Sequence, residues 1–239
     1  MTSSRSTILA ALRGAQRKPT LILLCSTVLM LVWRYYGTPE ALVPRFAAAG
    51  GGDGRAAGAA AGFAACFLLL GVLPALLVRF VLGERLADYG LGPGATRAAW
   101  LSLVAGCPVF LAAAWFASRD ASILEKFPIN PHADASAAAF ALHAATYLLF
   151  YAGWEFHFRG FLLCGLRPAI GDANAVLVQA MASSLLHIGS PASETFGAIL
   201  GGLFWGALAL RTGSLLPGLG QHFLLGIALD AFIFLGRDG

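Results

Sequence analysis

Three polar residues in a strongly apolar segment are candidates for chemistry: Glu155, His157 and Arg159. They lie within residues 151–160, whose sequence is YAGWEFHFRG. An ionised group at the centre of a bilayer costs about 2.5–3.5 kcal/mol on insertion scales, so it is usually paired and usually functional. On a helix, Glu155 and Arg159 are four residues apart, which places them on one face and allows them to pair. His157 lies about 200° around the helix from Glu155 and faces elsewhere.

The other ionisable residues of the apolar segments lie on the late part of the chain: His143, His187, His222 and Asp230. One carboxylate, two histidines from other helices and one guanidinium can perform general-base hydrolysis. Burial makes a carboxylate a better base, while a nearby arginine keeps it ionised. Histidines on the opposite side can hold the water or stabilise an oxyanion.

Spacing alone leaves three interpretations open: catalysis, a transport or ion pathway, and structural pairing inside a helical bundle. His143 and His157 share a second face and fit the structural interpretation better, and Glu194 and Arg211 are expected at the membrane interface. The chain has no serine elbow, HExxH motif, phosphate loop or dinucleotide fingerprint. Classical serine and zinc hydrolases are therefore not indicated.

The composition predicts a polytopic membrane protein with an all-α fold. Of the 239 residues, 58% are hydrophobic and only 12% are charged, against about 25% charged residues in soluble domains. The net charge of +4 is too small to indicate nucleic-acid binding and fits basic loops facing anionic lipid. The four cysteines lie in four separate apolar segments without a CxxC motif, so they are expected to be packing residues.

Apolar stretches divide the chain into about seven or eight spans. Seven are expected near residues 20–36, 59–82, 98–117, 135–166, 174–189, 194–210 and 218–235. The first could be a signal peptide, but its aromatic end favours an uncleaved helix. Residues 1–19 form a basic N-terminal segment, 20–134 a scaffold with loops at 37–58 and 118–134, and 135–239 the region with the polar motifs.

The distribution of basic residues favours a cytoplasmic N-terminus. In that orientation the inner segments carry nine Lys and Arg residues and the outer segments six.

Three motifs in the C-terminal region share the pattern of a known family. WEFHFRG (154–160) precedes a helix that ends at His187, and TGSLLPGLGQH (212–222) follows. Together they resemble the CAAX-protease and bacteriocin-processing (CPBP) family of intramembrane proteases, which includes the Ras-converting CAAX endopeptidases. The family signature is E-E-x-x-x-R, then F-x-x-x-H, then H-x-x-x-N/D. The resemblance covers residues 150–235, and the WEFxFRG variant suggests a bacterial, myxosortase-like branch.

The resemblance implies roles for four residues. Glu155 matches the second glutamate, Arg159 the arginine, His187 the second-motif histidine and His222 the third-motif histidine. In the family, the glutamate and the second-motif histidine hold and activate a water, and the third motif stabilises the oxyanion. Glu155, oriented by Arg159, would therefore deprotonate a water held with His187, and His222 would stabilise the oxyanion.

Three positions depart from the signature. Trp154 stands where the first glutamate is expected, Ser183 replaces the phenylalanine, and Gly226 replaces the third-motif Asn/Asp. An active enzyme must then use Glu155 as its base. Asp230, one turn beyond Gly226, is a candidate for the missing polar group.

The expected function is a glutamic-type intramembrane endopeptidase of the bacterial inner membrane. It would cut a membrane-anchored or lipid-tailed protein near its C-terminus, and its other partner would be the bilayer. One alternative is a non-catalytic binding or bacteriocin-immunity protein, which the departures at Trp154 and Gly226 support. The other is a small proton-coupled transporter. No metal or other cofactor is expected, although one glutamate and two histidines could bind zinc. The sequence sets no oligomeric state.

Overall fold

The computed structural model describes residues 14–50 and 52–237, so most of the predicted basic N-terminal segment lies outside the described residues. The described part contains helices and no named strands, as predicted. Its α-helices are α2 (Arg17–Val32), α3 (Pro39–Ala48), α4 (Arg55–Cys66), α5 (Leu73–Leu76), α6 (Thr96–Ala117), α7 (Ala121–Leu124), α8 (Ala137–Glu155), α9 (Gly165–Ile170), α10 (Asp172–Leu185), α11 (Ala192–Thr212) and α12 (Leu216–Leu235). Four π-helical segments are η1 (Trp33–Gly37), η2 (Phe67–Val72), η3 (Leu77–Leu82) and η6 (Phe156–Cys164). Two 3₁₀ turns are η4 (Leu86–Tyr89) and η5 (Ala133–Ala135).

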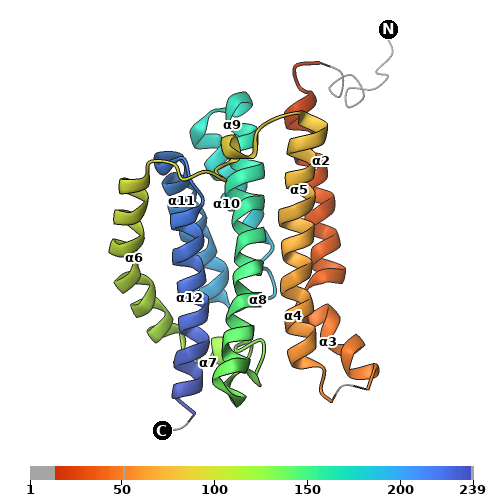
Figure 1. The fold of residues 1–239 in the computed structure, drawn as a ribbon, viewed down its shortest axis with the longest axis vertical. Helices are drawn as coiled ribbons and strands as arrows, with labels where there is room; N and C mark the ends of the chain where they lie inside the picture. The colour runs from red at the N-terminus through yellow and green to blue at the C-terminus, as the bar shows by residue number, and fades with distance from the viewer. Residues whose placement is uncertain (1–13, 51, 238–239) are drawn as a thin grey trace.

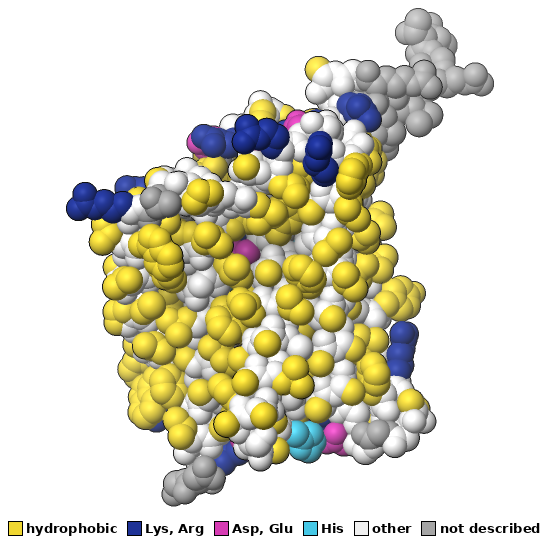
Figure 2. Space-filling view, viewed as in Figure 1, with side chains coloured by type: hydrophobic (Ala, Val, Ile, Leu, Met, Phe, Trp, Pro, Cys, Tyr) yellow, Lys and Arg dark blue, Asp and Glu magenta, His cyan; other side chains and the backbone are white. Residues whose placement is uncertain are grey.

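Six helices in the described residues are long and apolar enough to cross a membrane. The fifth predicted span, near residues 174–189, corresponds to α10, which has only 14 residues and runs beside α11. The chain passes up and down a bundle, with its described ends at opposite poles (Figure 1). Hydrophobic side chains cover the flank of the bundle and charged ones gather toward its two ends (Figure 2). The chain is therefore an integral membrane protein.

Part of the predicted loop 37–58 is helical, which corrects the sequence prediction. Thr38 caps α3, with its side chain accepting a hydrogen bond from the backbone nitrogen of Ala41 at 3.4 Å. Pro39 occupies the first turn, where its missing N–H costs nothing. Capping by Thr38 thus starts a short helix in a stretch whose Gly and Pro content predicted a loop.

The central element is the continuous helix α8–η6–α9, which spans 34 residues from Ala137 to Ile170. Its π-helical segment η6 is almost entirely buried and is surrounded by α2, η2, η4, α10 and α11. A π-helical turn shifts the register of the side chains that follow it, and such turns are frequent at functional sites. The predicted polar segment 151–160 lies across the junction between α8 and η6.

The loop before α6 is fastened to the junction of α11 and α12. The Leu215 backbone nitrogen donates to the Gly90 carbonyl at 3.0 Å, and the Ala95 nitrogen donates to the Thr212 carbonyl at 2.7 Å. The Ser214 hydroxyl adds a bond to the Gly92 carbonyl at 2.8 Å. These bonds hold one wall of the cavity described below.

Glycine allows α8 to approach η2 closely just before Glu155. A Cβ placed on Gly153 would lie 2.7 Å from both the Cys66 carbonyl oxygen and the Phe67 Cα. Gly71 faces the same point, since its own Cβ would lie 3.1 Å from the Gly153 Cα. This contact fixes the position of α8 within the polar segment, two residues before Glu155.

We predict that Gly153→Ala destabilises the protein by about 1–3 kcal/mol, because the added methyl group meets backbone atoms that cannot rotate away. Thermal unfolding in detergent would measure the loss as a lower Tm. The matched control is Gly197→Ala on α11, where nothing lies within 4 Å of the new Cβ. Equal Tm values for the two variants would contradict the predicted contact.

Candidate active site

Glu155 is the centre of a buried polar cluster. Its Oε1 accepts a hydrogen bond from His222 Nδ1 at 2.8 Å and lies 3.4 Å from Arg159 Nη1. Its Oε2 is buried and has no hydrogen-bond partner within the described residues. The pairing of Glu155 with Arg159 that the four-residue spacing predicted is present. The carboxylate therefore has one oxygen held by cationic or donor groups and one oxygen free.

His222 is held by two aromatic rings and by the carboxylate. The Trp205 ring stacks on it at 4.1 Å between ring centres, and the Tyr151 ring lies 4.6 Å away. The Trp205 indole nitrogen donates to Gln221 Oε1 at 3.1 Å, which fixes the stacking ring. Because His222 Nδ1 faces an ionised carboxylate, the proton lies on Nδ1 and Nε2 is left free for another group.

Arg159 is buried and close to both the carboxylate and an aromatic face. Its guanidinium carbon lies 5.6 Å from the centre of the Trp205 ring. Its Nε and Nη1 atoms have no hydrogen-bond partner in the part of the chain that is described. A buried guanidinium with free donors can stabilise a second negative charge besides that of Glu155.

A cavity of about 410 Å³ reaches Glu155 from the side of the bundle. Its lining comes from α8, from the start of α12 and from the fastened loop, and consists of Gly90, Leu91, Gly92, Pro93, Ala152, Glu155, Leu215, Leu216 and Leu219. Figure 2 shows an acidic group in a hollow of the otherwise hydrophobic flank. The cavity is thus apolar except where the carboxylate lies.

His187 lies in the connection between α10 and α11, beside the residue that precedes Glu155. Its Nδ1 is 2.8 Å from the Ser183 carbonyl oxygen, and its ring meets the Trp154 ring edge-on at 5.4 Å. No hydrogen bond joins it to Glu155 among the described residues. Burial lowers the pKa of His187 below its usual value, although the Ser183 carbonyl and Glu194 oppose that effect. The ring is therefore neutral near pH 7.

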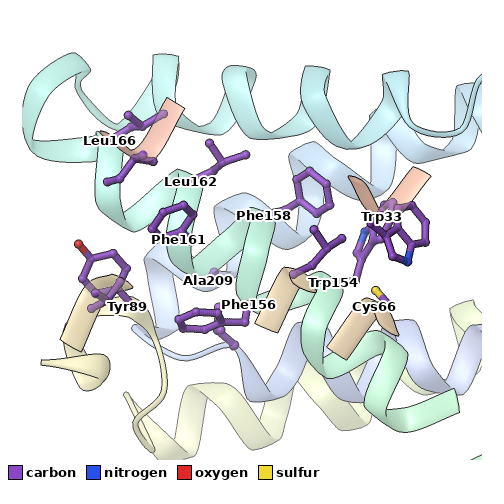
Figure 3. Close-up of a cluster of buried hydrophobic side chains, with 14 residues drawn as sticks. Trp33, Cys66, Tyr89, Trp154, Phe156, Phe158, Phe161, Leu162, Leu166 and Ala209 are labelled. Atoms are coloured by element: carbon purple, nitrogen blue, oxygen red, sulfur yellow. The ribbon is translucent and has the colours of Figure 1, made fainter. Parts of the chain in front are cut away.

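Trp154 belongs to an aromatic core and not to the polar cluster. Its ring packs on Trp33 at 5.5 Å, Phe150 at 5.6 Å and Phe158 at 4.7 Å between ring centres. Figure 3 shows it next to Trp33 and Phe158, close to Cys66. At the position of the family's first glutamate, the side chain therefore packs in the aromatic core.

Two other predicted residues have partners elsewhere. His157 faces away from Glu155, as predicted, and its Nε2 is 2.6 Å from the Ser26 hydroxyl on α2. Asp230 is bound to His143, with 2.8 Å between Oδ2 and Nε2. The structure thus joins α8 to α2 and α12 through these residues, and no bond connects Asp230 to His222.

Tyr151 is a site residue that the sequence reasoning missed. A Cβ built on Gly226 would collide with the Tyr151 hydroxyl. The space of a third-motif Asn or Asp side chain is therefore taken by a phenol from α8. The available signal was spacing, because Tyr151 precedes Glu155 by four residues and lies on the same helix face.

No group of three or more His, Cys, Asp or Glu side chains within residues 14–50 and 52–237 is placed to hold a metal ion.

Comparison with known proteins identifies the C-terminal part of the chain. The family model described as type II CAAX prenyl endopeptidase Rce1-like matches residues 134–228. No curated protein and no solved structure matches the chain. The match includes Glu155, Arg159, His187 and His222, and it supports peptidase activity of the CAAX type in an integral membrane protein. Residues 134–228 therefore match the Rce1-like family of CAAX endopeptidases, as the three motifs predicted.

Proposed function

We propose that this protein is a glutamic-type intramembrane endopeptidase in which Glu155 activates the hydrolytic water. The observation that carries the proposal is the asymmetric carboxylate. Oε1 is held by His222 and Arg159, while the buried Oε2 has no partner, in a residue that lines the cavity. An ionised carboxylate with a free oxygen in a restricted space is suited to accept a proton from water.

In the proposed reaction, a water in the cavity donates one hydrogen bond to Glu155 Oε2. The carboxylate takes that proton as the water oxygen attacks the peptide carbonyl carbon. Negative charge then develops on the carbonyl oxygen, where Arg159 can stabilise it. His222 can add to this stabilisation only in its doubly protonated form, in which Nε2 also carries a proton. The proton on Glu155 passes to the departing amine as the C–N bond breaks. His187 would hold the water with Nε2 as the acceptor.

Tyr151 extends this site toward α12. Its ring lies against His222, and its hydroxyl fills the space beside Gly226. We assign it the supporting position that an Asn or Asp would otherwise occupy, in preference to Asp230, which is bound to His143.

The shape of the cavity fits a substrate that arrives from the membrane. Leucine side chains and the loop 90–93 form most of the lining, so a lipid-tailed chain can lie there while its peptide bond meets Glu155. Part of the cavity lining comes from the loop 90–93. The connection before α6, which contains this loop, lies at the same end of the bundle as α9 and the start of α2 (Figure 1). With the N-terminus inside a bacterial inner membrane, cleavage would occur toward the cytoplasmic side. A myxosortase-like branch would process C-terminal sorting tails in the same way.

A non-catalytic binding protein is the second candidate, and the packed Trp154 favours it. A site that lacks the family's first carboxylate could bind a tail without cutting it. The variants below separate the two.

We predict that Glu155→Gln and His187→Ala each lower cleavage of a prenylated CAAX-type peptide in liposomes by about 10²–10⁴-fold, the usual contribution of general acid–base groups. Mass spectrometry of the released C-terminal fragment would measure cleavage. The matched control is Glu125→Gln on an exposed loop, which should retain full activity. Full activity in folded Glu155→Gln would exclude the mechanism, and a wild type that binds the peptide without cutting it would favour the binding protein.

We predict that Gly226→Asn lowers the Tm, although it restores the family's residue, because the new side chain collides with the Tyr151 phenol. Adding Tyr151→Ala should recover much of the lost stability, since it empties the same space. Tyr151→Ala alone is the control, and it should leave a cavity and lower the Tm by itself. Additive losses in the double variant would show that the two positions do not compete for space.

A further inference from the structure

A second carboxylate approaches the site from α11. Glu194, which the sequence placed at the membrane interface, lies with Oε1 3.8 Å from His187 Nε2. Both side chains are about one-fifth exposed, so water screens their interaction only in part. The carboxylate thus faces the nitrogen of His187 that does not contact the α10 backbone.

The backbone of α10 determines which form of His187 faces Glu194. The Ser183 carbonyl can only accept a hydrogen bond, so Nδ1 at 2.8 Å carries the proton. In the neutral ring, Nε2 is then a lone pair that faces a carboxylate oxygen, and two acceptors do not bond. In the protonated ring, Nε2–H is a cationic donor directed at Glu194. The carboxylate therefore stabilises only the protonated form.

Lys126, which lies on the loop 118–136, has the opposite effect on the protonation of His187. Its Nζ lies 2.8 Å and 2.9 Å from the two Glu194 oxygens and 2.8 Å from the Ser190 hydroxyl. It neutralises part of the charge that Glu194 presents to His187. Both charges are held in place, since Lys126 is bound at three oxygens.

The remaining charged groups around His187 come from the other elements packed nearby. His222 on α12 adds repulsion when protonated. Arg34 of η1 lies beside Gly189, with its Nη2 3.7 Å from the position of a Cβ there. From α8, the closest contact is the uncharged Trp154 ring. Glu194 is thus the acidic group that lies directly beside His187.

We propose that Glu194 is a positioning residue that sets the protonation state of His187, and that Lys126 limits its effect. The second carboxylate of the site would then come from α11, while position 154 belongs to the aromatic core. The consequence for catalysis rests on the proposed protease function, whereas the coupling between Glu194 and His187 does not.

The direct test is the titration of His187 followed by NMR of histidine-labelled protein in detergent micelles, with the signal assigned from its absence in His187→Gln. Glu194→Gln removes the stabilising anion, so the midpoint should fall by about 1 pH unit. Lys126→Met removes the opposing cation, so the midpoint should rise. Glu194→Asp should restore most of the wild-type value, and Glu125→Gln on the exposed loop should leave it unchanged. Identical midpoints in wild type, Glu194→Gln and Lys126→Met would overturn the proposal.

Cleavage of the prenylated peptide gives the second readout. Activity needs neutral His187, so it is lost as pH falls through the pKa of this residue. The acid limb should move to lower pH in Glu194→Gln and to higher pH in Lys126→Met.

Loss of activity with an unchanged His187 midpoint would assign Glu194 a purely structural role. If Glu194→Gln does not fold, the Lys126→Met midpoint decides the question. If wild type cuts no peptide while the midpoints shift as expected, the protease function fails and the coupling stands.

Discussion

The structure depends on keeping the carboxylate of Glu155 ionised inside an apolar bundle. A buried charge is strongly destabilising when its partners are removed, and here those partners come from two helices. Arg159 follows on the same helix, and His222 comes from α12. Further contacts hold His222 in place. Trp205 stacks on His222, and Gln221 joins Trp205 to the Ser102 carbonyl of α6. The polar contacts at this level of the bundle therefore converge on the Glu155 carboxylate.

The antiparallel pairing of α8 with α12 brings three contacts together along one seam. Glu155 meets His222 at one level, Tyr151 meets Gly226 one turn further along, and His143 binds Asp230 near the opposite end. A sliding of one helix by a turn would break all three contacts at once. The distant pair of His143 and Asp230 thus fixes the register of the seam.

Much of this arrangement follows from local sequence rules. The apolar stretches predicted the helices, and the four-residue spacing predicted the pairing of Glu155 with Arg159. The motifs indicated that His187 and His222 belong to the same region, and the match over residues 134–228 includes both. Glu194 could not be recognised in this way, because its contact with His187 depends on how α11 packs. Spacing could place Tyr151 on the face of Glu155, but its contact with Gly226 depends on how α12 packs. The helix α3 was missed because its start depends on one capping threonine in a loop-like stretch.

The bonds between the loop 90–95 and the junction of α11 and α12 have a consequence for substrate choice. Leu215 is hydrogen-bonded to Gly90, and Ser214 to Gly92, so the part of the cavity wall formed by the loop 90–93 is fixed to the start of α12. A bound chain then does not have to order this wall, which lowers the entropic cost of binding. Under the proposed function, a wall held in this way would favour slender aliphatic tails and extended peptide over folded protein. Selection would thus occur before the chemistry begins.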